Sequence, residues 1–166
     1  MEIRPATLDD VDAVVALVES AYRGESSRAG WTTEADLLDG QRTDAREVAE
    51  VLPDTLVAVE GGELVGSCVL AHKGDVGYFG MFAVRPTLQG RGVGSALLTA
   101  AEHRAKELGL PFVEMTVLSG RRELIAYYER RGYADTGERR PFPYGDERFG
   151  LPRTDDLEFA VLRKRL

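Results

Sequence analysis

The hydrophobic positions near the N-terminus predict first a strand and then a helix. Residues 2–6 have the composition of a short strand, and 7–10 fit the capping-box pattern, in which side chains satisfy the first backbone N–H groups of a helix. The next segment, 23–52, has weak periodicity and predicts a loop with short helical pieces near 34–38 and 44–52. Between these segments the apolar residues recur at helical spacing along one stripe: Val11, Val14, Val15, Val18 and Tyr22.

Three consecutive segments in the middle of the chain predict antiparallel strands. Residues 55–59 are rich in β-branched side chains, and a turn over 60–63 joins them to an apolar run over 64–71. A second turn, at 73–75, leads into 76–84, whose aromatic residues favour a third strand of the same sheet.

The second half of the chain predicts two helices that alternate with strands. Residues 112–118 predict a strand, 119–131 a helix closed by a glycine, and 157–163 a final strand; one more strand can form near 133–139. We interpret the whole chain, residues 1–166, as one domain of the α+β class. The clearest helix covers 92–109, with these residues on one face: Val93, Leu97, Leu98, Ala101, Ala105 and Leu108.

Composition and charge narrow the class of protein. A chain of 166 residues is long enough to bury its own core, and 21 Lys and Arg against 28 Asp and Glu give a net charge of −7. This charge opposes binding to nucleic acid or to an anionic membrane. No apolar stretch approaches the ~20 residues of a membrane span and no leader is evident, so we expect a cytoplasmic protein.

The single cysteine limits the covalent and metal chemistry that the chain can use. Cys68 has no cysteine to pair with inside the chain, and one cysteine cannot make a Cys-based zinc site. Because it lies in the apolar run over 64–70, we expect a buried structural thiol rather than a nucleophile. We expect no metal site.

Glycines at alternate positions mark the passage from the strand over 76–84 to the helix over 92–109. The N-terminus of a helix offers unpaired N–H groups and about half a positive charge, so Gly90, Gly92 and Gly94 predict a main-chain cradle for a pyrophosphate. Arg91 can add a charge-assisted contact. The spacing differs from the dinucleotide-binding fingerprint and from a Walker loop. A glycine-rich turn that only starts a helix is the alternative.

The block Gln89-Gly90-Arg91-Gly92-Val93-Gly94 resembles the acetyl-CoA-binding motif of the GNAT superfamily of N-acetyltransferases. The later segment 127–133 is similar to the family's aromatic helix ending. The resemblance implies an α/β/α layered fold whose mixed, mostly antiparallel sheet has six to seven strands, flanked by about four helices and splayed between the fourth and fifth strands. It also implies direct transfer of an acetyl group from acetyl-CoA to a primary amine in a ternary complex, and is compatible with a homodimer.

The resemblance assigns cofactor-binding roles to individual positions. Main-chain groups of Phe82, Ala83 and Val84 correspond to those that pair with the pantetheine arm, in the manner of an added strand. The following loop and the start of the helix correspond to the phosphate-binding segment: Gln89, Gly90, Arg91, Gly92, Val93, Gly94 and Ser95.

Acetyl transfer from a thioester needs a neutral amine, a polarised carbonyl and a proton for the departing thiolate. Tyr128 resembles the tyrosine that family members place beside the sulfur of CoA, and a phenol with a reference pKa near ~10 can donate that proton. Because Leu124, Ile125 and Tyr128 share one helical face, a core aromatic is the alternative role. Tyr127 is the alternative donor.

The residue that accepts the proton of the amine is less defined. The strand over 76–84 contains no carboxylate, where some family members carry a glutamate. Glu114, a charge inside the apolar strand 112–118, is our candidate for the base or for an anchor of a cationic substrate; an exposed position, with a water chain as base, is the alternative. Arg121 replaces an asparagine of many relatives, and we expect Arg121 and Arg122 either to reach the phosphates of CoA or to be solvated.

The acceptor amine is not identified by the sequence. In the family the segment between the first two strands, here 23–52, lines the acceptor site, and Trp31 and Glu34 could grip an ammonium group there, with plain packing as the alternative for Trp31. A loop over 139–146 is expected to close the same cleft. Two other functional classes stay open: a non-catalytic acetyl-CoA sensor, and a structural partner protein whose glycine loop holds no ligand.

Overall fold

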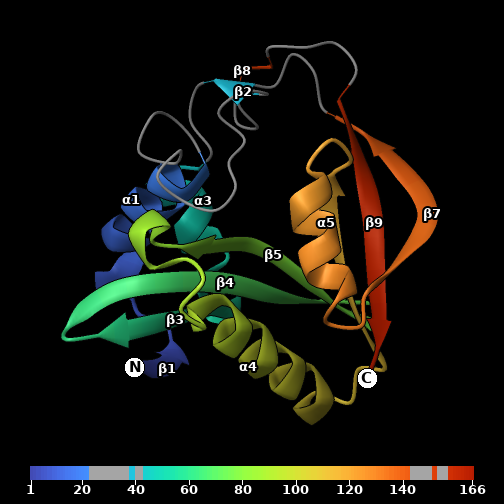
Figure 1. Cartoon of the computed structure of the whole chain (residues 1–166). Helices are drawn as coiled ribbons and strands as arrows, with labels where there is room; N and C mark the ends of the chain where they lie inside the picture. The colour runs from blue at the N-terminus through green and yellow to red at the C-terminus, as the bar shows by residue number, and fades with distance from the viewer. Residues whose placement is uncertain (23–37, 40–42, 143–150, 153–156) are drawn as a thin grey trace.

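The chain folds around a twisted sheet that separates two groups of helices (Figure 1). The computed structural model describes residues 1–22, 38–39, 43–142, 151–152 and 157–166. The described helices are α1 (Val11–Tyr22), α3 (Ala45–Glu50), α4 (Val93–Glu107) and α5 (Arg122–Glu129). The strands are β1 (Glu2–Pro5), β2 (Leu38–Asp39), β3 (Thr55–Glu60), β4 (Glu63–Lys73), β5 (Val76–Val84), β6 (Phe112–Leu118), β7 (Ala134–Pro141), β8 (Leu151–Pro152) and β9 (Glu158–Arg165).

The main sheet has seven strands in the order β1-β3-β4-β5-β6-β9-β7. All neighbouring strands in it are antiparallel except β5 and β6, which are parallel. The short strands β2 and β8 form a separate antiparallel pair. This arrangement confirms the expected mixed, mostly antiparallel sheet with about four helices.

Alternate residues of each strand point to opposite faces of the sheet, and each face has its own apolar core. On β3, Leu56 and Ala58 pack with α4 and α5, whereas Val57 packs with α1 and α3. The α4 side contains Leu97, Leu98 and Ala101, all fully or almost fully buried. The sheet therefore lies between two helical layers, as expected for a layered α/β/α fold.

The parallel strands β5 and β6 are in register over only three residue pairs, Val76–Tyr78 with Phe112–Glu114. Beyond these pairs β6 stays with β9, with which it pairs along its whole length, Phe112 with Arg165 through Leu118 with Phe159. The sheet is therefore splayed between its fourth and fifth strands in chain order, where the sequence led us to expect it.

Three sequence-based expectations about local structure meet clear outcomes. Leu108, assigned to the buried face of its helix, is 49% exposed; the helix ends before it, and Leu110 turns back into the core instead, its N–H bonded to the Ala105 carbonyl. Of the expected helical piece near 34–38, Leu38 is described and belongs to β2. Cys68 is fully buried, and this burial raises the pKa of its thiol to about 12, which confirms a structural thiol. No described helix is long and apolar enough to cross a membrane.

The start of α1 is fixed by an ion pair from β1. The carboxylate of Asp10 accepts hydrogen bonds from both terminal nitrogens of Arg4, at 2.8 and 3.1 Å, and from the backbone N–H of Thr7 at 2.7 Å. The bonds from Arg4 hold the pKa of Asp10 at about 2, well below its ordinary value. Because the pKa is lowered on folding, ionised Asp10 stabilises the fold above about pH 4 and loses this effect as the pH falls toward 2.

Asp10→Asn is therefore expected to lower the free energy of unfolding at pH 7 by roughly 2 kcal/mol. The difference from the unaltered protein should shrink as the pH falls from about 4 to about 2, because both forms are then uncharged at this position. Urea unfolding followed by circular dichroism at several pH values measures this. Asp9→Asn, at the exposed neighbouring carboxylate, is the control; an equal loss in both variants would contradict the assignment.

Candidate functional site

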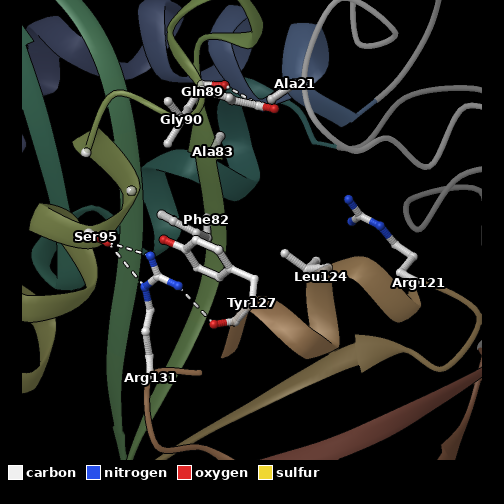
Figure 2. A pocket seen from close by; sticks show the side chains of 13 residues that line it. Ala21, Phe82, Ala83, Gln89, Gly90, Ser95, Arg121, Leu124, Tyr127 and Arg131 are labelled. Carbon is white, nitrogen blue, oxygen red and sulfur yellow. Dashed lines mark hydrogen bonds between the residues drawn. The ribbon is translucent and has the colours of Figure 1, made fainter. Parts of the chain in front are cut away.

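The first turn of α4 borders a cavity of about 300 Å3 between α4, β5 and α5 (Figure 2). Its walls combine the end of β5, the glycine loop that follows and one face of α5. The lining residues are Ala21, Phe82, Ala83, Val84, Gln89, Gly90, Gly92, Gly94, Ser95, Arg121, Leu124, Tyr127 and Arg131. Of the cofactor residues expected from the sequence, only Arg91, which is exposed, and Val93, which is buried in the core, are absent from this lining.

The N-terminus of α4 has the properties of an anion-binding site. Gly92 is the N-cap residue; its φ of 86° is in the left-handed region, and no side chain caps the helix. The N–H groups of the first turn have no carbonyl partners within the helix and remain available to a ligand. A Cβ on Gly90 or Gly92 would meet no protein atom within 4 Å, so the space beside the loop is open. These features fit a phosphate group.

Gly94 has a different environment from the other two glycines of the loop. A Cβ at this position would lie 2.9 Å from Cζ of Phe82 and 3.1 Å from the hydroxyl of Tyr127. The absence of a side chain thus lets α4 approach the two aromatic rings that line the cavity. Gly94 therefore shapes the cavity wall by close packing.

Polar contacts hold the loop before α4 in place. The side-chain amide of Gln89 donates to the carbonyl of Val84 at 3.2 Å, which closes the loop back onto the end of β5. Arg85 donates to Glu63 at 2.9 Å and to the carbonyl of Leu64 at 3.1 Å, which ties the same end to β4. Gln89 thus serves the geometry of the loop as well as lining the cavity.

Arg131, just beyond α5, was not identified from the sequence and is part of the cavity wall. Its guanidinium donates to Oγ of Ser95 from Nε at 3.2 Å and from Nη2 at 2.8 Å, and from Nη1 to the carbonyl of Tyr127 at 3.0 Å (Figure 2). It also covers the ring of Tyr127, with Cζ 3.5 Å from the ring centroid. The resemblance over 127–133 includes Arg131 but does not indicate which element its side chain would contact.

Strand β5 bulges where it borders the cavity. Ser67 pairs with Ala83 and Val69 with Gly80, so two residues of β5, Met81 and Phe82, lie opposite one residue of β4. Met81 has a φ of 45°, a left-handed conformation that is unusual for a residue other than glycine and that marks local strain. A bulge redirects the chain and its side chains. Phe82, which lines the cavity, is one of the two residues of this bulge.

A second cavity, of about 480 Å3, opens where β5 and β6 part. It shares Phe82, Arg121 and Leu124 with the first, so the two cavities meet beside the bulge. Ligands in both could therefore come into contact. Its other lining residues are Glu47, Val51, Val69, Ala71, Lys73, Tyr78, Phe79, Gly80, Met81, Met115, Thr116, Val117, Leu118, Tyr128, Arg140, Pro141, Phe142 and Phe159.

The two tyrosines of α5 line different cavities. Tyr128 is 3% exposed, lines the second cavity and packs against the rings of Phe79 and Phe82 at centroid distances of 6.5 and 6.3 Å. Tyr127 lines the first cavity. Tyr128 is thus a core aromatic that also borders the second cavity, so its role as acid stays a prediction.

Glu114 is buried and paired with two arginines. It accepts hydrogen bonds from Arg163 at 2.7 and 3.1 Å and from Arg140 at 3.1 Å, and its side chain is 7% exposed. The alternative of an exposed strand position is therefore wrong. Glu114 does not line either cavity described here, whereas Arg140 lines the second, and its role as base stays a prediction.

The arginines at the start of α5 have different environments. Arg121 is 6% exposed and lines both cavities, so the alternative of a solvated side chain is wrong for it. Arg122, the other arginine considered, is exposed.

Parts of the expected acceptor segments do line the second cavity. Glu47 and Val51 come from the segment 23–52. Arg140 comes from the segment 139–146, which was expected to be a loop, but it lies in β7. Trp31 and Glu34, the candidate substrate residues, lie outside the described residues. Tyr78 and Thr116 were not predicted from the sequence; their hydroxyls are 2.6 Å apart across the opening between β5 and β6.

Comparison with known proteins gives consistent matches. Residues 13–133 match the family described as acetyltransferase (GNAT) family. The chain is 29% identical over 141 residues to an aminoalkylphosphonate N-acetyltransferase of Salmonella typhimurium, covering 80% of this chain and 84% of that one. It is 30% identical over 137 residues to an acetyltransferase of Pectobacterium atrosepticum, with 80% and 87% covered. The crystal structure of a ribosomal-protein-alanine N-acetyltransferase from Brucella melitensis superposes with a TM-score of 0.73 at 20% identity, over 100% of both chains.

Gly92→Ala is expected to weaken the binding of acetyl-CoA, the ligand implied by the motif, at least tenfold, because the methyl group would enter the open space beside the helix N-terminus. Because alanine is strained at the left-handed φ of this position, the variant should also have a free energy of unfolding lower by roughly 1 kcal/mol. Calorimetric titration and urea unfolding measure the two effects.

Gly109→Ala at the other end of α4 is a matched control, because Gly109 also has a left-handed φ, 74°, and no protein atom near its Cβ position. This variant should lose similar stability and keep its affinity for acetyl-CoA. Equal affinities of both variants and the unaltered protein would contradict the phosphate-binding loop.

Proposed function

The chain belongs to the acetyltransferase (GNAT) family, and on this premise we propose how its two cavities transfer an acetyl group from acetyl-CoA to an amine. Acetyl-CoA is the co-substrate, and the enzyme is an N-acetyltransferase. The observation that carries the proposal is that a cavity with a helix N-terminus meets a second cavity at the point where the sheet opens. The first cavity is then the site of acetyl-CoA and the second the site of the amine.

The lining of the first cavity supports an orientation for acetyl-CoA. The phosphates bind at the N-terminus of α4, where Gly90, Gly92 and Ser95 line the cavity. The pantetheine arm runs along β5 from Val84 to Phe82 and pairs with its main chain as an added strand would. The thioester then lies near Phe82, where the two cavities meet.

The reaction forms a bond from the amine nitrogen to the acetyl carbon and breaks the bond from that carbon to sulfur. The thioester supplies an activated acyl group, the nitrogen loses a proton and the sulfur gains one. We propose Tyr128 as the donor to sulfur, since it borders the acceptor cavity and packs against Phe82. Tyr128 is 3% exposed and is packed among aromatic rings, which limits the access of bulk water to it.

Glu47 is our candidate for the group that receives the proton of the amine, directly or through water. It is the only carboxylate among the described residues that line the second cavity. For Glu114 we propose an anchoring role, because its bonds to Arg140 and Arg163 hold Arg140 against the cavity wall. A carboxylate held by two guanidinium groups is a weak proton acceptor.

We propose that the acceptor is a small amine that also carries an acidic group. Lys73 and Arg121 line the second cavity and can attract an anionic group on the acceptor. Arg140 also lines it, but its charge is already paired with Glu114 and Glu138. A curated relative is named for aminoalkylphosphonates, which combine an amine with an acid. Glu34 and Trp31 stay candidates for contacts to the ammonium end.

Release of CoA thiol with a panel of acceptors tests this specificity. An aminoalkylphosphonate and an α-amino acid are expected to give at least tenfold higher kcat/KM than a simple alkylamine of equal chain length, which has neither a phosphonate nor a carboxylate group. A polyamine and a basic peptide complete the panel. Preference for the polyamine or the peptide would overturn the acceptor class, and absence of thiol release with every amine, despite binding of acetyl-CoA, would favour a sensor.

Tyr128→Phe is expected to lower kcat about a hundredfold and to change the affinity for acetyl-CoA little, since only the proton donor is removed. Single-turnover kinetics with a good acceptor and titration with acetyl-CoA measure the two quantities. Tyr127→Phe is the matched variant on the neighbouring ring. If it shows the large loss of kcat while Tyr128→Phe does not, the acid is Tyr127.

A further inference from the structure

We propose that Arg131 is a second phosphate-binding group of the acetyl-CoA site, opposite the N-terminus of α4, and that it gives the site a preference for phosphorylated forms of the acyl carrier. The inference rests on the proposed position of acetyl-CoA in the first cavity. The glycine motif does not include Arg131, which is almost forty positions further along the chain.

All the contacts of Arg131 with the described part of the chain are to neutral groups. Its acceptors are the hydroxyl of Ser95 and the carbonyl of Tyr127, and the ring of Tyr127 covers its face. Three of the five N–H groups of the guanidinium are used in these bonds, which leaves two for another acceptor. The positive charge thus has no carboxylate partner among the described residues.

Three other arginines among the described residues pair with carboxylates. Arg4 pairs with Asp10, Arg85 with Glu63 and Arg139 with Asp135, each with an N···O distance of 2.8 or 2.9 Å. Arg131 lies on a cavity wall and has no such partner among the described residues, in a protein with a net charge of −7. This arrangement favours a bound anion as its partner.

The position of Arg131 at the helix end strengthens this inference. Ser95, which accepts two of its hydrogen bonds, is in the first turn of α4, where the helix dipole is positive. A cation beside this end raises the electrostatic free energy unless an anion lies between or near the two. A phosphate in the first cavity would receive the main-chain N–H groups from one side and the guanidinium from the other.

The contacts of Arg131 also fix its direction. Stacking on Tyr127 and the bonds to Ser95 hold the guanidinium in one place, so little side-chain entropy is lost when an anion binds. Ser95 accepts both bonds and donates to no described residue, so its hydroxyl hydrogen can also reach the phosphate. Arg91 differs from Arg131 in that its side chain is exposed and does not line the cavity, so its contact with a phosphate stays a prediction.

The competing explanation is a structural brace that ties α5 to α4 and has no ligand. The two explanations differ in their dependence on phosphate. A brace would affect the folded state and every ligand of the cavity equally, whereas a phosphate-binding group affects only ligands that carry phosphate.

The test is calorimetric titration of Arg131→Gln with acetyl-CoA and with S-acetylpantetheine, which lacks all the phosphates. Loss of a charge-assisted bond to phosphate should weaken the binding of acetyl-CoA about tenfold or more and leave the affinity for S-acetylpantetheine unchanged. Arg130→Gln, which removes the same charge from the exposed neighbouring position, is the matched control and should bind both as the unaltered protein does. Equal losses for both ligands would overturn the proposal in favour of the brace.

Arg131→Lys separates charge from the hydrogen-bonded fork and is available if the glutamine variant does not fold. It should keep part of the preference for acetyl-CoA over S-acetylpantetheine, and this preference should fall as salt is raised. If the preference of the unaltered protein for acetyl-CoA over S-acetylpantetheine does not fall as salt is raised, the role of charge is contradicted. If the unaltered protein binds neither ligand, the proposed function itself fails, which is a different outcome.

Discussion

The unequal pairing of β6 with its two neighbours is the constraint on which the site depends. β6 shares seven register pairs with β9 and only three with β5, so it follows β9 and leaves β5 after Tyr78. The opening makes room for two cavities that meet, and the bulge at Met81 and Phe82 is at their junction. If the two parallel strands were paired to their ends, the main chain of β6 would fill the space that the reactants need.

Local electrostatics in this protein oppose its overall charge. The chain carries a net charge of −7, yet the two cavities are lined by the end of a helix dipole and by Lys73, Arg121 and Arg131. A bound anion is stabilised by these near groups, because interactions with exposed charges beyond about 10 Å are screened at moderate salt. The acidic surface therefore does not prevent the binding of a polyanion such as acetyl-CoA.

The sequence was informative where chemistry depends on neighbouring residues along the chain. The glycine loop is predictable because alternate glycines before a helix create a main-chain cradle without help from other segments. Arg131 was not predictable, since its role depends on α5 meeting α4 at Ser95. Glu114 has the same limitation: the ladder from β6 through β9 to β7 brings Arg163 and Arg140 to it, and no local pattern encodes that order. The predicted buried face of α4 was wrong only at Leu108, because the helix ends before this residue and its side chain is exposed.

The pairing of β2 with β8 joins Leu38 and Asp39 to Leu151 and Pro152, more than a hundred positions away in the chain. Each partner belongs to one of the two connections that flank the described walls of the acceptor cavity, the first ahead of α3 and the second between β7 and β9. Insertions or deletions in one connection would shift its strand against the other. The two connections are therefore expected to tolerate changes of length only together.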